Sequence, residues 1–194
     1  MYKIDLSNVT LVCGDSLPEH TKHINNIFSI LENRIKFYDM IHYDKHIHSI
    51  EEYNMFCASK LDEIVDTDFC MVVQWDGYPI NFDAWDPKFL EYDYIGAPWL
   101  LQPHALDQTV GNGGFSIRSK AYLENTKMSV VHGDYSGDEP EDVYFCRTKK
   151  LDNLDYAPIG VAYEFSVEDM PYKGQFGFHG MSTIQINKGL GIFH

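Results

Sequence analysis

The sequence predicts an α/β domain built on a mostly parallel sheet, and three observations support this fold class. Residues 8–13, 35–39 and 68–74 form short runs rich in apolar, β-branched or aromatic side chains, which are typical of buried strands. Segments with helical spacing of apolar residues, 18–31 and 49–64, separate these runs. Strands that alternate with helices in this way favour a Rossmann-like parallel sheet with helices on both faces.

Local signals define the two helices. Pro18 and Glu19 are typical of a helix start. Ser49 and Glu52 have the spacing of a capping box, in which each side chain satisfies a backbone N–H at the beginning of the helix. A short further strand at 40–43 can follow the strand at 35–39.

The second half is expected to be less regular. Glycine and proline punctuate it, and its apolar runs are short. We predict a turn at 82–87, a short helix at 88–92 and a strand at 94–99 that runs into a loop at 100–110. A glycine-rich turn at 111–118 is expected to lead into a strand. Helices are expected at 119–124 and 141–149, a strand at 157–167 and a turn at 176–180. No repeat or linker divides the chain, so we expect a single domain over 1–194.

Charge and cysteine content restrict the function. The net charge of −14, from 29 acidic and 15 basic residues, disfavours binding to nucleic acid or anionic membranes. An anionic substrate would need a metal ion or helix N-termini to neutralise it locally. The four cysteines form no CxxC pair, and no signal peptide or membrane-spanning run is visible. We therefore expect a cytoplasmic protein with reduced thiols and no transmembrane segment.

Four features along the chain carry candidate chemistry. Asp76 closes the strand at 68–74, where ligands bind in open α/β sheets, and carboxylate oxygens suit divalent cations. The others are the glycines at 111–114, Glu141-Asp142 and His179. Each has a structural alternative: Asp76 could form a turn, the glycines a tight backbone, the acidic pair a helix start, and the histidine a polar surface.

Taken together, these features resemble nucleotide-sugar-dependent glycosyltransferases of the GT-A fold. The sequence is similar to a family of small GT-A-like domains with five short patterns, and it is also similar to a sugar transferase domain of a large DNA virus. The five patterns are Gln-Trp-Asp-Gly at 74–77, Tyr-Asp-Tyr-Ile-Gly-Ala-Pro-Trp at 92–99, Gly-Asn-Gly-Gly-Phe at 111–115, Glu-Asp-Val at 141–143 and Gly-Phe-His-Gly at 177–180.

The resemblance implies a metal-dependent transfer of a hexose or deoxyhexose from a UDP sugar to an acceptor hydroxyl, with inversion. It implies that Asp76 and His179 bind the metal. Mn²⁺ is expected, with Mg²⁺ as the alternative, because an imidazole among oxygen ligands suits Mn²⁺. Asp142 corresponds to the catalytic base, and Glu141 is second choice. The family's first metal-site acid is Gln74 here, whose amide can still hydrogen-bond a ribose.

The resemblance also divides the domain into a nucleotide-binding half at about 1–78, an acceptor and catalytic half at about 79–180, and a C-terminal tail at 181–194. Trp99 and the loop that follows are expected to contact a carbohydrate or glycoconjugate acceptor. For Tyr38, which is also a candidate for donor binding, a place in the hydrophobic core fits equally well. The residues expected to bind the donor are Thr10, Val12, Tyr38, Asp39, Asn54, Gln74, Trp75, Asp76, Gly113, Gly114 and Lys173.

Two other functions fit parts of this pattern. A non-catalytic module that binds nucleotide sugars or carbohydrates is favoured by Gln74. A metal-dependent nucleotidyltransferase or phosphatase is disfavoured, because such enzymes cluster several acids around two metal ions and the 74–76 segment has one. The domain could also belong to a larger multi-domain glycosyltransferase.

Overall fold

A five-stranded sheet organises the computed structural model, which describes residues 4–45, 47–99 and 110–193. The order of the strands is β2-β1-β3-β6-β5. Strands β1, β2 and β3 are parallel, whereas β6 is antiparallel to both β3 and β5. The predicted α/β class with a mostly parallel sheet is confirmed. The strands are β1 (Ile4–Gly14), β2 (Ile35–Tyr43), β3 (Phe69–Val72), β5 (Tyr94–Gly96) and β6 (Ser116–Ser119).

The register of the parallel strands places their carboxyl ends at one edge of the sheet. Gly14 at the end of β1 pairs with Tyr43 at the end of β2, and Val12 pairs with Val72 at the end of β3. Because these strands point the same way, the loops that follow them meet above this edge, where open α/β sheets bind ligands.

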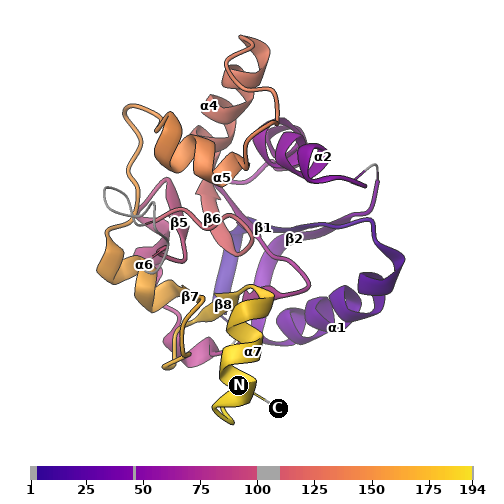
Figure 1. The fold of residues 1–194 in the computed structure, drawn as a ribbon, viewed down its shortest axis with the longest axis vertical. Helices are drawn as coiled ribbons and strands as arrows, with labels where there is room; N and C mark the ends of the chain where they lie inside the picture. Colours follow the sequence, from indigo (N-terminus) through magenta and orange to yellow (C-terminus); the bar gives the residue numbers. More distant parts are fainter. Residues whose placement is uncertain (1–3, 46, 100–109, 194) are drawn as a thin grey trace.

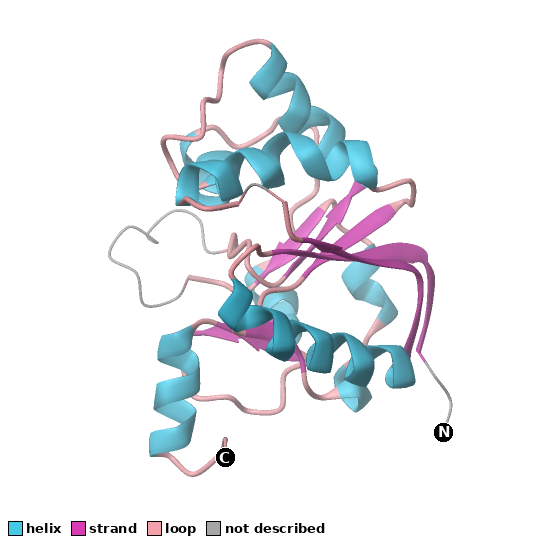
Figure 2. Ribbon diagram, turned by 90° about the vertical axis from the view of Figure 1, so that its right-hand side faces the viewer, coloured by secondary structure: helices cyan, strands magenta, loops and turns pink. Residues whose placement is uncertain are grey.

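Helices cover both faces of the sheet (Figures 1 and 2). Helix α1 lies on one face, and α2 and α4 lie on the other. The chain of α2 continues through a π-helical turn, η1, into α3, which gives one helical segment over 50–64. The bounds are α1 (Pro18–Arg34), α2 (Ile50–Met55), η1 (Phe56–Lys60), α3 (Leu61–Ile64) and α4 (Lys120–Val131).

A second, three-stranded sheet with the order β4-β8-β7 ties the end of the chain to the turn after β3. In this sheet Gly77 pairs with His179, and Glu168 pairs with the same histidine from the other side. The remaining elements are β4 (Gly77–Pro79), η2 (Phe82–Ala84), η3 (Pro87–Leu90), α5 (Glu141–Val143), a π-helical turn η4 (Tyr144–Thr148), α6 (Ile159–Phe165), β7 (Ser166–Glu168), β8 (Gly177–His179) and α7 (Met181–Gly189).

Four buried phenylalanines join the second half to the main sheet. Phe115 stacks on Phe165 with a centroid distance of 4.6 Å, and Phe89 and Phe176 surround this pair. Burying aromatic rings supplies much of the stabilisation of a domain of this size. The four described cysteines are buried free thiols, as expected from their spacing.

Several predictions for single elements were wrong. Residues 157–167 form mainly helix α6 and not a strand, because Pro158 precedes the helix and the Ala162 and Phe165 side chains, three positions apart, are both buried. The expected turn at 176–180 contains β8, and the expected tail contains α7. Residues 35–43 form one strand and not two.

The predicted loop at 100–110 lies outside the described residues except for its last position. No helix among the described residues is long and apolar enough to cross a membrane.

Candidate functional site

The turn that follows β3 is held firmly at the sheet edge. The Val73 N–H donates to the Val12 carbonyl at 2.9 Å, which extends the contact between β3 and β1. Gln74 and Gly77 then exchange two backbone hydrogen bonds of 2.9 and 3.1 Å, so Trp75 and Asp76 occupy the tip of a two-residue turn. This geometry places Asp76 beyond the strand end, where the sequence predicted a cation site.

His179 lies beside this turn and is held by polar partners on both ring nitrogens. Its Nε2 is 2.8 Å from Oε1 of Gln74, and its Nδ1 is 2.9 Å from Oε1 of Glu168. The Asp76 carboxylate is 3.9 Å from Nε2. Asn112 also contacts Glu168 at 2.8 Å and so keeps that carboxylate in place. The structure thus brings together the two predicted metal ligands, and Gln74 joins them.

Glu168 is a site residue that the sequence reasoning missed. It lies on β7, and the parallel pairing of β7 with β8 sets it opposite His179. No sequence spacing indicates this contact, because β7 is three residues long and the strand expected over 157–167 ends before Glu168. A carboxylate on Nδ1 is the usual partner of a metal-binding histidine, because it orients the ring and leaves Nε2 to face the cation.

These residues fit a divalent cation that has further ligands. Asp76 Oδ1 and His179 Nε2 are separated by a distance that a single cation can bridge, and the Gln74 amide oxygen lies beside them. No group of three or more His, Cys, Asp or Glu side chains in the described parts of the chain could hold a metal by itself. A cation here would therefore also need oxygens from a substrate or water.

Opposing effects act on the pKa of His179. Burial by itself would lower the pKa, but the hydrogen bond and negative charge of Glu168, followed by the charge of Asp76, outweigh it. The pKa therefore lies above its ordinary value of 6.5. The same negative charges would attract a cation, which would compete with a proton for Nε2.

Asp142 lies across the site from Asp76, at the start of α5. Its Oδ2 accepts a hydrogen bond of 2.8 Å from the Gly113 N–H, and its Oδ1 accepts one of 2.8 Å from the Val143 N–H. Burial raises the pKa of Asp142 to about 7, and the neighbouring charge of Glu141 adds to the increase. A carboxylate with this pKa is suited to accept a proton near neutral pH.

Glu141, the second choice for the base, has a different environment. It is buried, and its Oε1 accepts a 2.7 Å hydrogen bond from Nη2 of Arg118, which has no exposed surface. A carboxylate engaged in a buried ion pair is poorly placed to take a proton from a substrate. The geometry therefore favours Asp142 over Glu141.

The two glycines between the metal ligands and Asp142 have no room for a side chain. A Cβ atom at position 114 would lie 2.0 Å from His179 Nε2 and 2.5 Å from Gln74 Oε1. At position 113 it would lie 2.6 Å from Glu141 Oε1. The sequence predicted close backbone approach to a substrate here, and the structure shows close approach to the site's own side chains.

Two connected cavities open at this edge. One, of about 400 Å³, is bordered by the β1 and β3 ends and the start of α2; it includes Asp15, Ser49 and Asp76. The other, of about 180 Å³, includes Gly113, Gly114 and Asp142. The cavities share four lining residues: Ile50, Tyr53, Gln74 and His179. The two cavities therefore adjoin along these four residues, with Asp76 lining the first and Asp142 the second.

Four of the residues predicted to bind the donor base lie away from these cavities. Thr10 and Val12 are buried within β1, and the Thr10 hydroxyl bonds that of Thr67 at 2.8 Å. Tyr38 and Asp39 lie midway along β2, with Tyr38 64% exposed and hence not in the core. The strands extend to Gly14 and Tyr43, beyond the ends assumed from sequence, so later residues such as Asp15, His48 and Tyr53 border the larger cavity instead.

The other predicted residues have varied positions. Asn54 lines the smaller cavity, but its side chain mainly holds the 137–141 segment through bonds to the Gly137 and Glu139 carbonyls and the Glu141 N–H. Trp99 is 7% exposed and lies under the Arg147 guanidinium. Lys173 is exposed between β7 and β8 and borders neither cavity. Substrate roles for these residues stay predictions.

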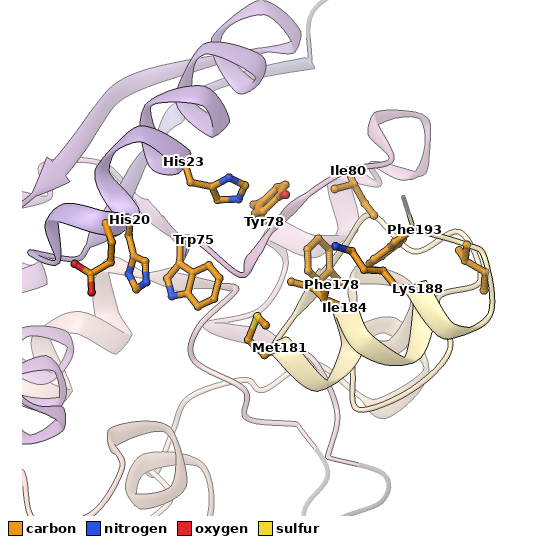
Figure 3. A pocket seen from close by; sticks show the side chains of 12 residues that line it. His20, His23, Trp75, Tyr78, Ile80, Phe178, Met181, Ile184, Lys188 and Phe193 are labelled. Carbon is orange, nitrogen blue, oxygen red and sulfur yellow. The ribbon is translucent and has the colours of Figure 1, made fainter.

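A third cavity, of about 710 Å³, adjoins the site on the other side of Trp75 (Figure 3). It lies between α1 and α7, with His20 and His23 on one wall and Met181 and Ile184 on the other. Trp75 stacks on His20 at 4.5 Å, and this pair borders both the third cavity and the 400 Å³ cavity. Trp75, predicted to contact the donor, is thus positioned between two spaces.

This topology describes an α/β fold with a polar site at the carboxyl edge of its parallel strands. The fold is similar to the crystal structure of a glycosyltransferase involved in the glycosylation of the major capsid of PBCV-1, with a TM-score of 0.53 and 12% sequence identity over 95% of this chain and 98% of the other. Residues 37–179 match the model of the family described as "Protein of unknown function (DUF5672)", so the chain belongs to that family. A comparison with curated proteins finds no match.

Proposed function

We propose that this domain is a metal-dependent glycosyltransferase that moves a hexose or deoxyhexose from a UDP sugar to the hydroxyl of a carbohydrate or glycoconjugate acceptor, with inversion. The fold similarity supports the general class of glycosyl transfer. The UDP donor, Mn²⁺ and inversion come from the sequence resemblance and are part of the proposal.

One observation carries this proposal most directly. A pair of potential metal ligands, Asp76 and His179, and a carboxylate with a raised pKa, Asp142, border connected cavities at the carboxyl edge of a parallel sheet. Transfer of a sugar needs positive charge near the departing diphosphate and a proton acceptor near the incoming hydroxyl. In the proposal, His179 beside Gly114 and Asp142 beside Gly113 would serve these two requirements.

Asp76 and His179 would hold the cation, with Gln74 beside them and Glu168 orienting the imidazole. A cation bound there would supply Lewis-acid stabilisation of negative charge on the diphosphate. This arrangement also explains how a protein of net charge −14 can bind an anionic donor.

Asp142 would remove the proton of the acceptor hydroxyl as its oxygen attacks the anomeric carbon. The two backbone N–H groups that bond its oxygens fix the carboxylate in one orientation. They also favour the ionised form and limit the increase in pKa that burial and Glu141 cause. A base placed to assist direct attack on one side of the sugar is consistent with inversion.

A non-catalytic module that binds nucleotide sugars is the second candidate. The observation in its favour is the 2.8 Å contact between Gln74 and His179 Nε2, the nitrogen that would face a cation. An amide in this position has no charge to offer the metal, which would weaken its binding.

Isothermal titration of UDP-glucose and other UDP hexoses with and without Mn²⁺ tests the binding step. We expect the nucleotide sugar and Mn²⁺ each to tighten binding of the other, because the diphosphate completes the metal's ligands. The variant D76N should abolish this mutual effect, whereas K36Q, which changes an exposed residue on β2, should not. Equal binding in Mn²⁺ and in EDTA would contradict the metal-bridged site.

Hydrolysis of UDP-glucose by wild-type protein and D142N separates an enzyme from a binding module. We expect D142N to lose a factor of about 10² or more in rate, which is the usual contribution of a positioned base, while it still binds the donor. The wild-type rate should fall as the pH drops below about 7, because Asp142 becomes protonated. Donor binding without turnover by the wild type would favour the module.

A further inference from the structure

We propose that Arg118 is a positioning residue for Asp142, and that it acts through the Gly113 backbone and through Glu141. This inference rests on the proposed role of Asp142 as the base. Arg118 itself lies behind the site, is fully buried on β6 and borders neither cavity, so it does not contact a substrate there.

The first connection runs through both polar backbone groups of Gly113. Arg118 Nη2 donates to the Gly113 carbonyl at 3.1 Å, and Arg118 Nε donates at 3.1 Å to Ser116, whose hydroxyl donates to the same carbonyl at 3.0 Å. The Gly113 N–H donates to Asp142 at 2.8 Å. The guanidinium fork is rigid and planar, so it holds the 113–114 peptide through the Gly113 carbonyl, and the N–H that bonds Asp142 lies on the other side of the same Cα, in the preceding peptide.

The second connection runs through the residue next to the base. Arg118 Nη2 is 2.7 Å from Glu141 Oε1, and Glu141 directly precedes Asp142 at the start of α5. The three side chains of Arg118, Glu141 and Asp142 all lie close to Gly113, where an added Cβ would be 2.6, 3.0 and 3.1 Å from Glu141 Oε1, Arg118 Nη2 and Asp142 Cβ. The three side chains therefore crowd one backbone position.

The ion pair has features that stability alone does not explain. Removing two charges from water costs several kcal/mol per ion, and well-packed apolar residues often replace such pairs without loss of stability. Within the described residues, Arg118 Nη1 and Glu141 Oε2 are buried and have no hydrogen-bond partner among the protein atoms, and the guanidinium lies over the Tyr94 ring. A charged pair kept in this state directly behind Asp142 is better explained by its effect on that carboxylate.

The charges of Arg118 and Glu141 also shift the pKa of Asp142 in opposite directions. Glu141 disfavours the ionised form of Asp142, and Arg118 favours it. The other titratable groups facing Asp142 are Cys146 on the same helical segment, Cys57 on η1, Tyr94 on β5, Tyr135 after α4, and His179 on β8. Arg118 Cζ also lies 5.6 Å from the Tyr94 ring centroid and 5.9 Å from that of Tyr122, so replacement of Arg118 is compared with replacement of Glu141 and with replacement of both.

Variants of the full chain test this inference with two readouts. The pKa of Asp142 is measured by ¹³C NMR of its carboxyl carbon, assigned by its loss in D142N, and kcat and KM are measured for UDP-glucose hydrolysis. The variants are R118Q, R118K, E141Q and R118Q/E141Q. The control K127Q removes a positive charge from α4, where Lys127 pairs with Asp62 away from the site.

We expect R118Q to raise the pKa of Asp142 by about one unit, because a nearby opposite charge typically shifts a carboxyl by that amount or more. E141Q should lower it, and R118Q/E141Q should return it toward the wild-type value. In R118Q, kcat should fall tenfold or more with KM within twofold, and the double variant should keep a low kcat because the Gly113 carbonyl is no longer held by the guanidinium.

R118K retains the charge but not the fork. It should keep the pKa of Asp142 and lower kcat, and it decides the question if R118Q does not fold. Wild-type values of both pKa and kcat in R118K and R118Q would overturn the inference, as would equal effects in K127Q. The NMR readout needs no turnover: if wild-type protein hydrolyses neither UDP-glucose nor any other UDP hexose or deoxyhexose, the proposed function fails, while the pKa of Asp142 still tests its dependence on Arg118.

Discussion

At the scale of the residue, the site depends on positions where a side chain has no space. Gly114 lies between His179 and Gln74, and a Cβ there would meet the imidazole ring that faces Asp76. The glycine therefore lets the chain pass close to the two side chains beside the proposed cation. Glu168 acts at the same scale by holding the other side of that ring.

Replacing Gly114 by alanine should damage both binding and stability. Displacing His179 or Gln74 should weaken the Mn²⁺-dependent binding of UDP-glucose at least tenfold, and the overpacking should cost about 1–3 kcal/mol of unfolding free energy. G160A is the matched control, because Gly160 lies in α6 with open space around its Cα. It should leave binding unchanged and gain up to about 1 kcal/mol in urea unfolding. Equal binding by both variants would contradict the crowding at position 114.

At the scale of the element, the helical segment over 50–64 shows which features are local. The Ser49 half of the predicted capping box is confirmed, because the Glu52 N–H donates to the Ser49 hydroxyl at 3.2 Å. The Glu52 carboxylate accepts from the His48 N–H, one residue before the cap, at 2.6 Å. The π-helical turn at Phe56–Lys60 was not predicted. It lies where this segment packs against α4, so its cause is tertiary.

The Ser49 cap provides a prediction for this element. S49A should lower the unfolding free energy by about 0.5–2 kcal/mol, because the N–H of Glu52 loses its partner at the helix start. S29A, in the exposed interior of α1, should have no such cost, because alanine is the better helix former. Urea unfolding followed by circular dichroism measures both. A loss in S29A as large as that in S49A would mean that the cap adds nothing.

At the scale of the whole molecule, a buried carboxyl such as Asp142 links stability to pH. Its pKa is about 7 in the folded protein and near 3.8 when exposed, so the folded state disfavours its ionised form. Below pH 3.8 the group is protonated in both states and costs nothing. Between pH 3.8 and 7 the unfolded state ionises first, so the cost to the folded state grows, and above pH 7 it is constant.

The stability of D142N relative to wild-type protein should therefore increase with pH. We expect D142N to gain unfolding free energy as the pH rises from 4 to 7 and to keep that gain at pH 8, with a size of order a few kcal/mol because one pKa unit corresponds to about 1.4 kcal/mol. Thermal unfolding at pH 4.5, 6 and 8 measures the trend. A difference between the two proteins that does not depend on pH would show that Asp142 is not buried as a strained carboxylate.

The local pattern of the chain was sufficient for the fold class, the helix starts and the segments that carry Asp76, Asp142 and His179. Hydrophobic periodicity and capping depend on neighbours a few residues apart, so they can be read from sequence. Strand ends could not be read in this way, which is why Thr10, Val12, Tyr38 and Asp39 were expected near the donor and lie along the strands instead. Helix α6 was missed because the sequence predicted a strand over 157–167, although Pro158 is a local helix-start signal.

Tertiary structure alone decided how these segments meet. Glu168 reaches His179 through the β7-β8 pairing, and Arg118 reaches Gly113 and Glu141 because β6 runs antiparallel beside β3. Such contacts join residues that are far apart in sequence, and they depend on register and on which side chains share a buried space. The sequence by itself determined an α/β domain with acids and a histidine in a recognisable order. Packing decided that Asp142 faces the cavity and that Glu141 is engaged by an arginine.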